Sequence, residues 1–350
     1  MHINDILERA LSGAVSDVHI TVGLPPVFRR HGELVPQQEL PVLGAEDTLR
    51  LVKELLDEER FERFRKDGEL DFAHSIAGGG RFRVNAFMQR GSAGLALRLI
   101  NTRIPSLEEL NMPPVLEELT HKTRGLVLVT GPTGSGKSTT LAALIDLINT
   151  HRACHIITLE DPIEYMHRHK KGMVNQREIG ADSRSFAHAL RAALRQDPDV
   201  ILVGEMRDLE TISIAITAAE TGHLVFATLH TSSAAQTIDR IIDVFPPYQQ
   251  QQVRVQLAET IQGIVAQQLI PRVDRPGRVA AVEVMVATAA IRNLVREGKT
   301  HQILSTIQTG GKFGMQSLDS ALLQLYRQGA INKEEVLNRC IDVASMRNSL

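Results

Sequence analysis

The spacing of hydrophobic residues changes character near residue 100 of the chain. Before that point, apolar residues at helical spacing predict an amphipathic helix over residues 3–11 and a second helical pattern over about 45–65. Polar and apolar residues alternate over residues 17–22, and the Gly-Leu-Pro-Pro that follows predicts a turn. These patterns predict a small α+β domain that ends near residue 100.

Residues 81–90 (RFRVNAFMQR) predict a strand of this domain with two different faces. One face carries Phe82, Val84, Ala86 and Met88, and the other carries Arg81, Arg83 and Asn85. A solvated basic face is the simplest interpretation of the two arginines. Residues 94–100 predict a neighbouring strand.

Beyond a connector at residues 100–113, rich in proline and polar residues, the pattern is different. Short, nearly continuous apolar runs at 125–130, 155–160, 200–205 and 223–229 are separated by helical patterns. Strands buried on both faces look like this, and their alternation with helices predicts a parallel sheet covered on both sides. After about residue 248 the pattern is mostly helical, with one strand at 278–286. We therefore predict domains at 1–99 and 114–350 and an α/β fold class.

Composition narrows the class of protein. A length of 350 residues suggests two domains, and 43% hydrophobic residues allow a large core. A formal charge of −2 gives no general attraction to nucleic acid or anionic lipid. Cys154 and Cys340 are too few for a disulfide framework or a four-cysteine zinc site, so no structural zinc is expected.

The N-terminus has neither a basic start nor an apolar core of the kind found in signal peptides. No apolar run approaches the roughly 20 residues that span a bilayer. We expect a soluble, cytoplasmic protein that reaches a membrane only indirectly, through a partner.

The strongest chemical motif is GPTGSGKS, which fits the phosphate-loop pattern G-x-x-x-x-G-K-[ST] in full. An apolar strand runs into the motif and an amphipathic helix leaves it, as this loop requires. Its glycines allow backbone N–H groups to curl around phosphate oxygens, Lys137 would reach the β and γ phosphates, and Ser138 would ligate Mg²⁺. The predicted nucleotide-binding residues here are Gly131, Thr133, Gly134, Ser135, Gly136, Lys137, Ser138 and Thr139.

Hydrolysis also needs acids near the metal, and two strand ends supply them. Glu205 follows the apolar run at 200–203, where the Walker B acid belongs, although Asp is commoner there. Glu160, Asp161 and Glu164 follow the run at 155–159. Such carboxylates would repel a nucleotide unless Mg²⁺ lies among them, so Glu205 and Glu160 are predicted metal ligands with Ser138, partly through water, and one acid could be the general base. Asp161-Pro162 is also a good turn starter, so a structural role for some of these acids stays open.

ATP is favoured over GTP as the nucleotide. The Asn-Lys-x-Asp signature of guanine recognition has one lookalike, the NKEE that starts at Asn332. It lacks the Asp and lies in a helical pattern near the C-terminus.

His223 and His230 bracket the apolar run at 224–229. They are seven residues apart, so in a regular strand they point to opposite faces and cannot share one metal ion. Because ligands bind at the carboxyl ends of strands in parallel sheets, His230 should lie on the nucleotide side. His223 falls at the other end of the strand and is harder to place there.

The motifs together resemble those of the secretion and pilus-motor ATPases, in particular the PilT family of type IV pilus retraction ATPases. The resemblance covers the chain from end to end: SDVHITVGLPP, RFRVNAF, GPTGSGKSTT, ITLEDPIE, VGEMRDLET, ETGHLVFATLHT and AIRNLVREGK. Most of these motifs occur across the superfamily. The last, at residues 290–299, resembles the retraction subgroup, although by itself it would predict an ordinary amphipathic helix.

The resemblance implies a PAS-like N-terminal domain, a RecA-like ATPase domain and a homohexameric ring with ATP at the subunit interfaces. It also implies an inner-membrane platform protein of the pilus machine as partner. By motif position, Glu164 resembles the catalytic glutamate and Glu205 the Walker B acid, while Arg83, with Arg81, would reach the nucleotide from the N-terminal domain. Both histidines belong to the family's site, so we expect His230 to sense the terminal phosphate and His223 to relay that state.

Four alternatives to a retraction motor stay open. Within the superfamily these are an ATPase of pilus assembly or type II secretion and an accessory paralogue of the retraction motor. The chain lacks the four-cysteine motif and the longer N-terminal region usual in the assembly and secretion enzymes. Outside the superfamily, the alternatives are a RecA-like nucleic-acid motor and a nucleotide-binding module that does not hydrolyse ATP.

Overall fold

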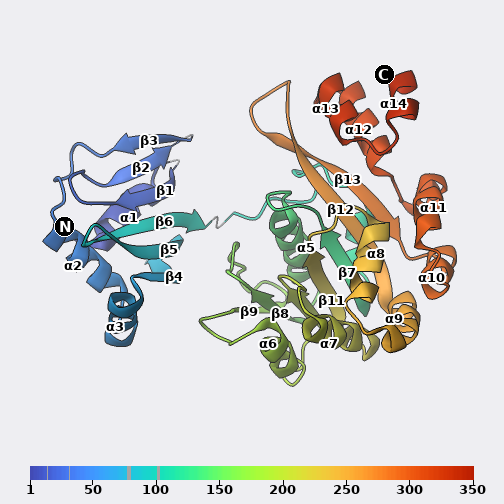
Figure 1. The fold of residues 1–350 in the computed structure, drawn as a ribbon, viewed down its shortest axis with the longest axis horizontal. Helices are drawn as coiled ribbons and strands as arrows, with labels where there is room; N and C mark the ends of the chain where they lie inside the picture. The colour runs from blue at the N-terminus through green and yellow to red at the C-terminus, as the bar shows by residue number, and fades with distance from the viewer. Residues whose placement is uncertain (14, 31, 77–79, 101–102) are drawn as a thin grey trace. The chain divides into compact units, whose positions relative to one another are not determined.

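The computed structural model describes residues 1–350 except 14, 31, 77–79 and 101–102 (Figure 1). The described residues form two compact units. One consists of Met1–Arg103 with the segment Glu164–Met166, and the other of Ile104–Ile163 with His167–Leu350. The predicted linker at 100–113 includes residues 101–102, which lie outside the described residues.

The smaller unit is built on a six-stranded antiparallel sheet with the order β3-β2-β1-β6-β5-β4. The strands are β1 (Val15–Ile20), β2 (Val27–Arg30), β3 (Glu33–Pro36), β4 (Glu69–Ile76), β5 (Gly80–Gln89) and β6 (Ser92–Ile100). The helices are α1 (Ile3–Leu11), α2 (Ala45–Leu55) and α3 (Glu58–Asp67), and their apolar sides share one core with the sheet. The helix at 3–11 and the pairing of 81–89 with 92–100 are confirmed.

The single helical pattern expected at 45–65 is two helices. Leu56 has extended backbone angles that end α2, and the Asp57 side chain accepts the Arg60 N–H to begin α3. Both Leu55 and Leu56 are buried, so the chain stays against the core where the helix breaks. Capping by an aspartate therefore overrides the run of helix-forming residues.

Strand β5 has the predicted two faces over most of its length. Phe82, Val84 and Ala86 are fully buried. Met88, expected on the same face, is 44% exposed; it pairs with Ala93 next to the turn between β5 and β6.

The larger unit contains a seven-stranded sheet with the order β13-β12-β7-β11-β10-β8-β9. Its strands are β7 (Gly125–Thr130), β8 (His155–Glu160), β9 (Met173–Glu178), β10 (Val200–Val203), β11 (Leu224–Leu229), β12 (Ile261–Pro271) and β13 (Arg278–Val286). Strands β12 to β9 are parallel, and β13 pairs antiparallel with β12. The predicted strands at 125–130, 155–160 and 278–286 are confirmed to the residue.

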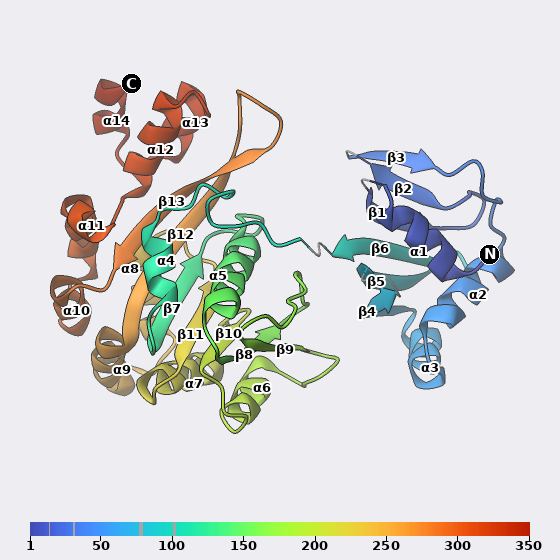
Figure 2. The same ribbon diagram turned by 180° about the vertical axis from the view of Figure 1, so that it is seen from behind.

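Helices cover both faces of this sheet, as predicted (Figures 1 and 2). Leu126 and Leu128 of β7 pack on one face with α6 (Phe186–Ala193), α7 (Leu209–Glu220), α8 (Ala234–Asp243), α9 (Pro247–Thr260), α10 (Ala289–Arg296) and α11 (Ile303–Thr309). Val127 and Val129 pack on the other face with α4 (Val115–Thr120) and α5 (Lys137–His151). Alternate residues of one strand thus enter different cores, which is why the strand sequence is apolar throughout.

The pattern beyond residue 248 is less helical than expected. Helix α9 ends at Thr260 and leads directly into β12, an 11-residue strand that the sequence did not predict. The pair Gln267–Gln268 interrupts the apolar run there and hides the strand. Strand β9 was also missed, because its sequence MVNQRE is mostly polar.

Three C-terminal helices complete the larger unit. Helices α12 (Leu318–Arg327), α13 (Lys333–Arg339) and α14 (Val343–Ser349) pack on the far end of the β12–β13 hairpin through a separate apolar cluster that includes Ile270, Val279 and Leu322. Two short 3-10 turns, Thr300–Gln302 and Gly311–Phe313, flank α11. Asn332 accepts the Glu335 N–H as the cap of α13, so the NKEE lookalike has a structural role.

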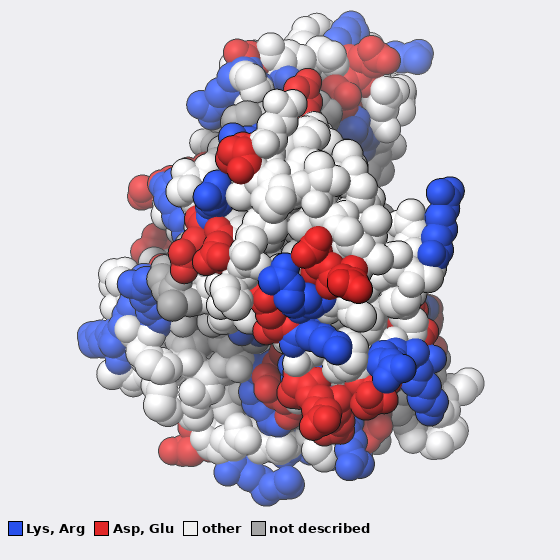
Figure 3. Space-filling model, turned by 90° about the vertical axis from the view of Figure 1, so that its left-hand side faces the viewer, with Lys and Arg blue, Asp and Glu red and all other residues white. Residues whose placement is uncertain are grey.

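Positive and negative side chains are interspersed over the face shown in Figure 3. That distribution agrees with the formal charge of −2 and offers no continuous basic surface on this face. Among the described residues, no helix combines the length and the apolar character needed to cross a membrane.

Candidate active site

Four neighbouring strands of the larger sheet bring predicted site residues together at one edge of the sheet, the edge formed by the carboxyl ends of the strands. In the order β7, β11, β10 and β8, their carboxyl ends lead into Gly131, His230, Glu205 and Glu160. The register fixes this alignment, because Thr130 pairs with Leu229 and Val203 pairs with Ala227 and Leu159. Ligands of open α/β sheets bind at such an edge.

The phosphate loop depends on glycine at defined points. Gly131, Gly134 and Gly136 have positive φ values of 143°, 77° and 89°, which other residues rarely adopt. At Gly131 a Cβ would lie 2.2 Å from the backbone oxygen of Gln267, so a side chain is excluded by contact as well. The backbone of the loop thus requires glycine for its conformation, and at Gly131 also for its packing against β12.

Lys137 and the start of α5 supply positive charge to this loop. The Lys137 side chain is buried, and its Nζ donates to the backbone oxygens of Gly131 at 2.8 Å and Pro132 at 3.0 Å. Helix α5 begins at Lys137, so its first N–H groups have no acceptor within the helix. An ammonium held over the loop and a 15-residue helix pointing its N-terminus at it fit a nucleotide phosphate chain.

Glu205 is bound by an arginine and a histidine. Its Oε1 lies 2.5 Å from Arg207 Nε and 3.1 Å from His230 Nε2. Burial raises the pKa of Glu205, but the hydrogen bonds and charges of Arg207 and His230 outweigh burial and hold its pKa below the ordinary value. The carboxylate therefore stays ionised at neutral pH, as a metal-binding acid must.

Glu160 is the last residue of β8, which pairs with β10, the strand that precedes Glu205. Its Oε1 accepts from Thr158 Oγ1 at 2.6 Å and from Gln176 Nε2 at 3.2 Å, so this carboxylate is oriented by its neighbours. Asp161, next in the chain, is exposed, and its bond to Pro162 is cis. No three potential ligands among His, Cys, Asp and Glu meet in the described part of the chain, so the roles of Ser138, Glu205 and Glu160 toward Mg²⁺ stay predictions.

Three predicted site residues belong to the other unit. Glu164 is exposed and falls in the segment Glu164–Met166, which groups with residues 1–103. On β5, Arg83 is exposed and Arg81 is half-buried. Their roles toward the nucleotide stay predictions.

His223 lies at the opposite edge of the sheet from the phosphate loop. Its backbone oxygen accepts the Gly125 N–H at the start of β7, and its Nδ1 lies 3.0 Å from the backbone oxygen of Ala218 at the end of α7. The six residues of β11 separate it from His230, a span of about 20 Å. His223 therefore lies away from the phosphate loop of its own chain, and its predicted part in the site stays a prediction.

Two residues near the loop were missed from the sequence. Arg207, two positions after Glu205, pairs with that acid, and the charge pattern of GEMRD could have indicated it. Gln267 contacts the phosphate loop from β12. Its only signal was a polar residue inside an apolar run.

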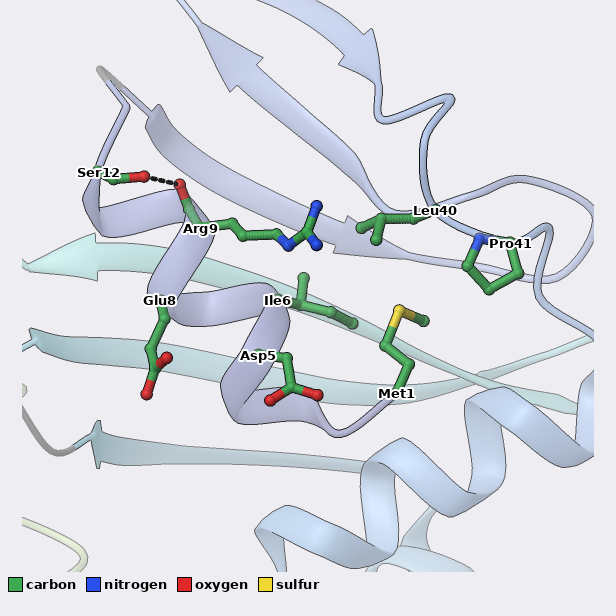
Figure 4. A pocket seen from close by; sticks show the side chains of 8 residues that line it. All are labelled: Met1, Asp5, Ile6, Glu8, Arg9, Ser12, Leu40 and Pro41. Carbon is green, nitrogen blue, oxygen red and sulfur yellow. Dashed lines mark hydrogen bonds between the residues drawn. The ribbon is translucent and has the colours of Figure 1, made fainter.

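A cavity of about 510 Å³ borders the phosphate loop at Gly136 and Thr139. Its other walls are the segment Glu109–Met112 and the β12–β13 hairpin with Arg272, Arg275 and Arg278. A second hollow, drawn in Figure 4, lies in the smaller unit between α1 and the loop at Leu40 and Pro41. It presents two carboxylates and one arginine but no glycine loop, so it does not fit a phosphate chain.

Comparison with known proteins identifies the family of the chain. The family model for type II/IV secretion system proteins matches residues 1–338. The chain belongs to this family. It is 50% identical over 334 residues to the type IV pilus retraction ATPase PilT of Pseudomonas aeruginosa, an alignment that covers 95% of this chain and 96% of that protein.

The chain is also similar to a second relative and to a solved structure. The type IV pilus ATPase PilU of the same organism is 44% identical, over 96% of this chain and 88% of its own. A crystal structure of the pilus retraction motor PilT with bound ADP superposes with a TM-score of 0.93, at 47% identity and 99% coverage of both chains. The predicted resemblance and the α/β fold class with a RecA-like ATPase domain are confirmed, and the chain is a member of an ATPase family.

Proposed function

We propose that this chain is an ATP-hydrolysing motor that powers the retraction of type IV pili. The observation that carries the proposal is the meeting of the phosphate loop, Glu205 and His230 at one sheet edge. A nucleotide-binding module that does not hydrolyse ATP would have no need for a second, oriented acid such as Glu160. The 50% identity to a retraction ATPase supports pilus retraction as the process that the hydrolysis drives.

The chain's own residues bind and orient the triphosphate. Lys137 exchanges its contacts with the Gly131 and Pro132 carbonyls for phosphate oxygens, and the N–H groups at the start of α5 hold the phosphate chain. The cavity beside Thr139 takes the base and ribose. Ser138, Glu205 and Glu160 are the residues that would hold a Mg²⁺ ion, which would neutralise phosphate charge.

Glu164 is proposed as the general base that takes a proton from the attacking water, and Arg83 with Arg81 as cations that stabilise the phosphoryl charge. These residues come from the smaller unit, so hydrolysis depends on how the units are arranged, as a motor requires. His230, bound to Glu205, is proposed to report the state of the terminal phosphate.

The working form is proposed to be a homohexamer in the cytoplasm, docked on an inner-membrane platform protein of the pilus machine. The relatives' names support retraction over the alternatives. Identity to the pilus retraction ATPase PilT, 50%, exceeds that to the pilus ATPase PilU, 44%, which also favours the retraction motor.

Purified protein tests the enzymatic part. We expect Mg²⁺-dependent ATP hydrolysis that falls at least about 100-fold in Lys137→Ala, because the lysine's charge on the phosphates is lost. Equal rates for the two proteins would overturn the proposal. Hydrolysis stimulated several-fold by DNA or RNA would instead favour a nucleic-acid motor.

Gene deletion in the source organism tests whether the motor drives retraction, assembly or secretion. Loss of a retraction motor leaves abundant surface pili on cells that no longer twitch. Loss of an assembly ATPase removes the pili, and loss of a secretion ATPase leaves pili and twitching intact. Complementation with Lys137→Ala should not restore twitching.

A further inference from the structure

Gln267 joins strand β12 to the phosphate loop. It is 2% exposed and follows Ala266, which pairs with Thr130 at the end of β7. The side chain therefore starts from the place where β7 becomes the loop. A buried amide is costly unless its donor and acceptor are both used.

Both ends of this amide are used, one by the phosphate loop and one by the first turn of α5. Nε2 donates to the Ser135 backbone oxygen at 2.7 Å, and Oε1 accepts from Thr140 Oγ1 at 2.9 Å. Ser135 precedes Lys137 by two residues and Thr140 follows it by three. One side chain thus fixes the loop and the first turn of α5 on either side of the lysine.

Gln267 also packs closely against two glycines of the phosphate loop. A Cβ on Gly131 would lie 2.2 Å from the Gln267 backbone oxygen, and a Cβ on Gly136 would lie 2.7 Å from Gln267 Nε2. The first and the last glycine of the loop are therefore both pressed against this one residue. Any shift of Gln267 must move the loop.

We propose that Gln267 is a positioning residue that presets the phosphate loop for the triphosphate. The inference rests on the proposed nucleotide binding and goes beyond it by assigning a residue outside the loop. Backbone N–H groups and Lys137 must match phosphate oxygens to within about 0.5 Å, and a misplacement of about 1 Å costs on the order of 100-fold. Gln267 supplies that precision from β12.

Gln268, the next residue, provides a matched control. It lies on the opposite face of β12 and borders a separate cavity of about 390 Å³ with Ser232 and Glu283. The two glutamines share a strand, a side-chain type and a flank of apolar residues. They differ in that only Gln267 touches the loop among the described contacts.

The experiment compares Gln267→Met, Thr140→Val and Gln268→Met in the full chain. Titration with MgATP gives the dissociation constant, steady-state hydrolysis gives KM and kcat, and thermal melting without nucleotide gives stability. We expect Gln267→Met to raise the dissociation constant and KM about tenfold or more, with a smaller rise for Thr140→Val. Gln268→Met should stay within about twofold of wild type.

A merely structural role for Gln267 predicts a lower melting temperature with unchanged KM and dissociation constant, and that result overturns the proposal. If Gln267→Met does not fold, Thr140→Val decides by the same criteria, since valine keeps the shape and removes one hydrogen bond. Failure of nucleotide binding in the wild-type protein would instead refute the proposed function.

Discussion

His230 Nε2 lies 3.1 Å from Glu205 Oε1, so the first residue after β11 touches the acid that follows β10. The contact follows from sheet register, because β10 and β11 are paired neighbours. Arg207 binds the same oxygen. A phosphate that draws either side chain away changes the surroundings of the Glu205 carboxylate, which gives the site a physical means to register nucleotide state.

Substitution of the two histidines should have different effects. His230→Ala removes a partner that orients Glu205, so we expect kcat for ATP to fall about tenfold or more. His223→Ala removes the same side chain from the opposite edge, where it contacts Ala218, and should leave the KM for ATP within about twofold. Steady-state hydrolysis measures both constants, and normal hydrolysis by both variants would mean that the histidines are only polar residues at strand ends.

Glu205→Gln should separate binding from hydrolysis. The amide keeps the volume but loses the negative charge that now pairs with Arg207 and accepts a contact from His230. We expect kcat to fall about 100-fold while MgATP still binds within a few-fold of wild type, because extra positive charge does not oppose phosphate. The dissociation constant and single-turnover rate measure the two effects, and full activity in this variant would remove Glu205 from the site.

The position of much of the site could be predicted because its residues directly follow strands that are easy to recognise in the sequence. The phosphate loop, Glu205 and His230 each follow a continuous apolar run, and parallel strands bring such positions to one edge whatever the connections. Their register was not needed for the prediction. The same argument correctly placed His223 at the other end.

Contacts between distant segments could not be predicted this way. Gln267 is 132 residues from Ser135, and a polar residue in β12 made its strand harder to see. The break between α2 and α3 turned on one capping side chain, Asp57, within a strongly helical pattern. In both places a single polar group overrides the local pattern through a hydrogen bond that only the fold reveals.

Acid should destabilise the larger unit through His167. Burial lowers the pKa of His167 to about 4, and its Nδ1 has no hydrogen-bond partner among the described residues. Asp146 favours the proton and Lys170 opposes it, but burial decides. Since the folded pKa lies below the unfolded value of 6.5, stability is complete above about pH 6.5 and is lost as the pH falls toward 4.

From pH 8 to pH 5.5 that loss amounts to about 1.4 kcal/mol. Other groups titrate over this range, so the measurement is the difference between wild type and His167→Gln, which cannot be protonated. Denaturant unfolding at both pH values should show the variant losing about 1.4 kcal/mol less than wild type. Parallel losses would show that His167 is not held neutral by the fold.

The segment AIRNLVREGK contributes to the stability of the fold, and Arg292 is one of the residues that do so. Ile291 and Val295 are fully buried on α10, and Arg292 Nη1 donates to the backbone oxygens of Ala258 and Glu259 at 2.7 Å each, at the end of α9. Arg292→Ala leaves these carbonyls without their charged donor, which should cost about 1.5–3 kcal/mol. Arg296→Ala, one turn later at an exposed position, should cost less than about 0.5 kcal/mol. Calorimetric melting separates the two, and an Arg292→Ala protein that melts like wild type but fails to restore twitching would assign this arginine to the motor's output instead.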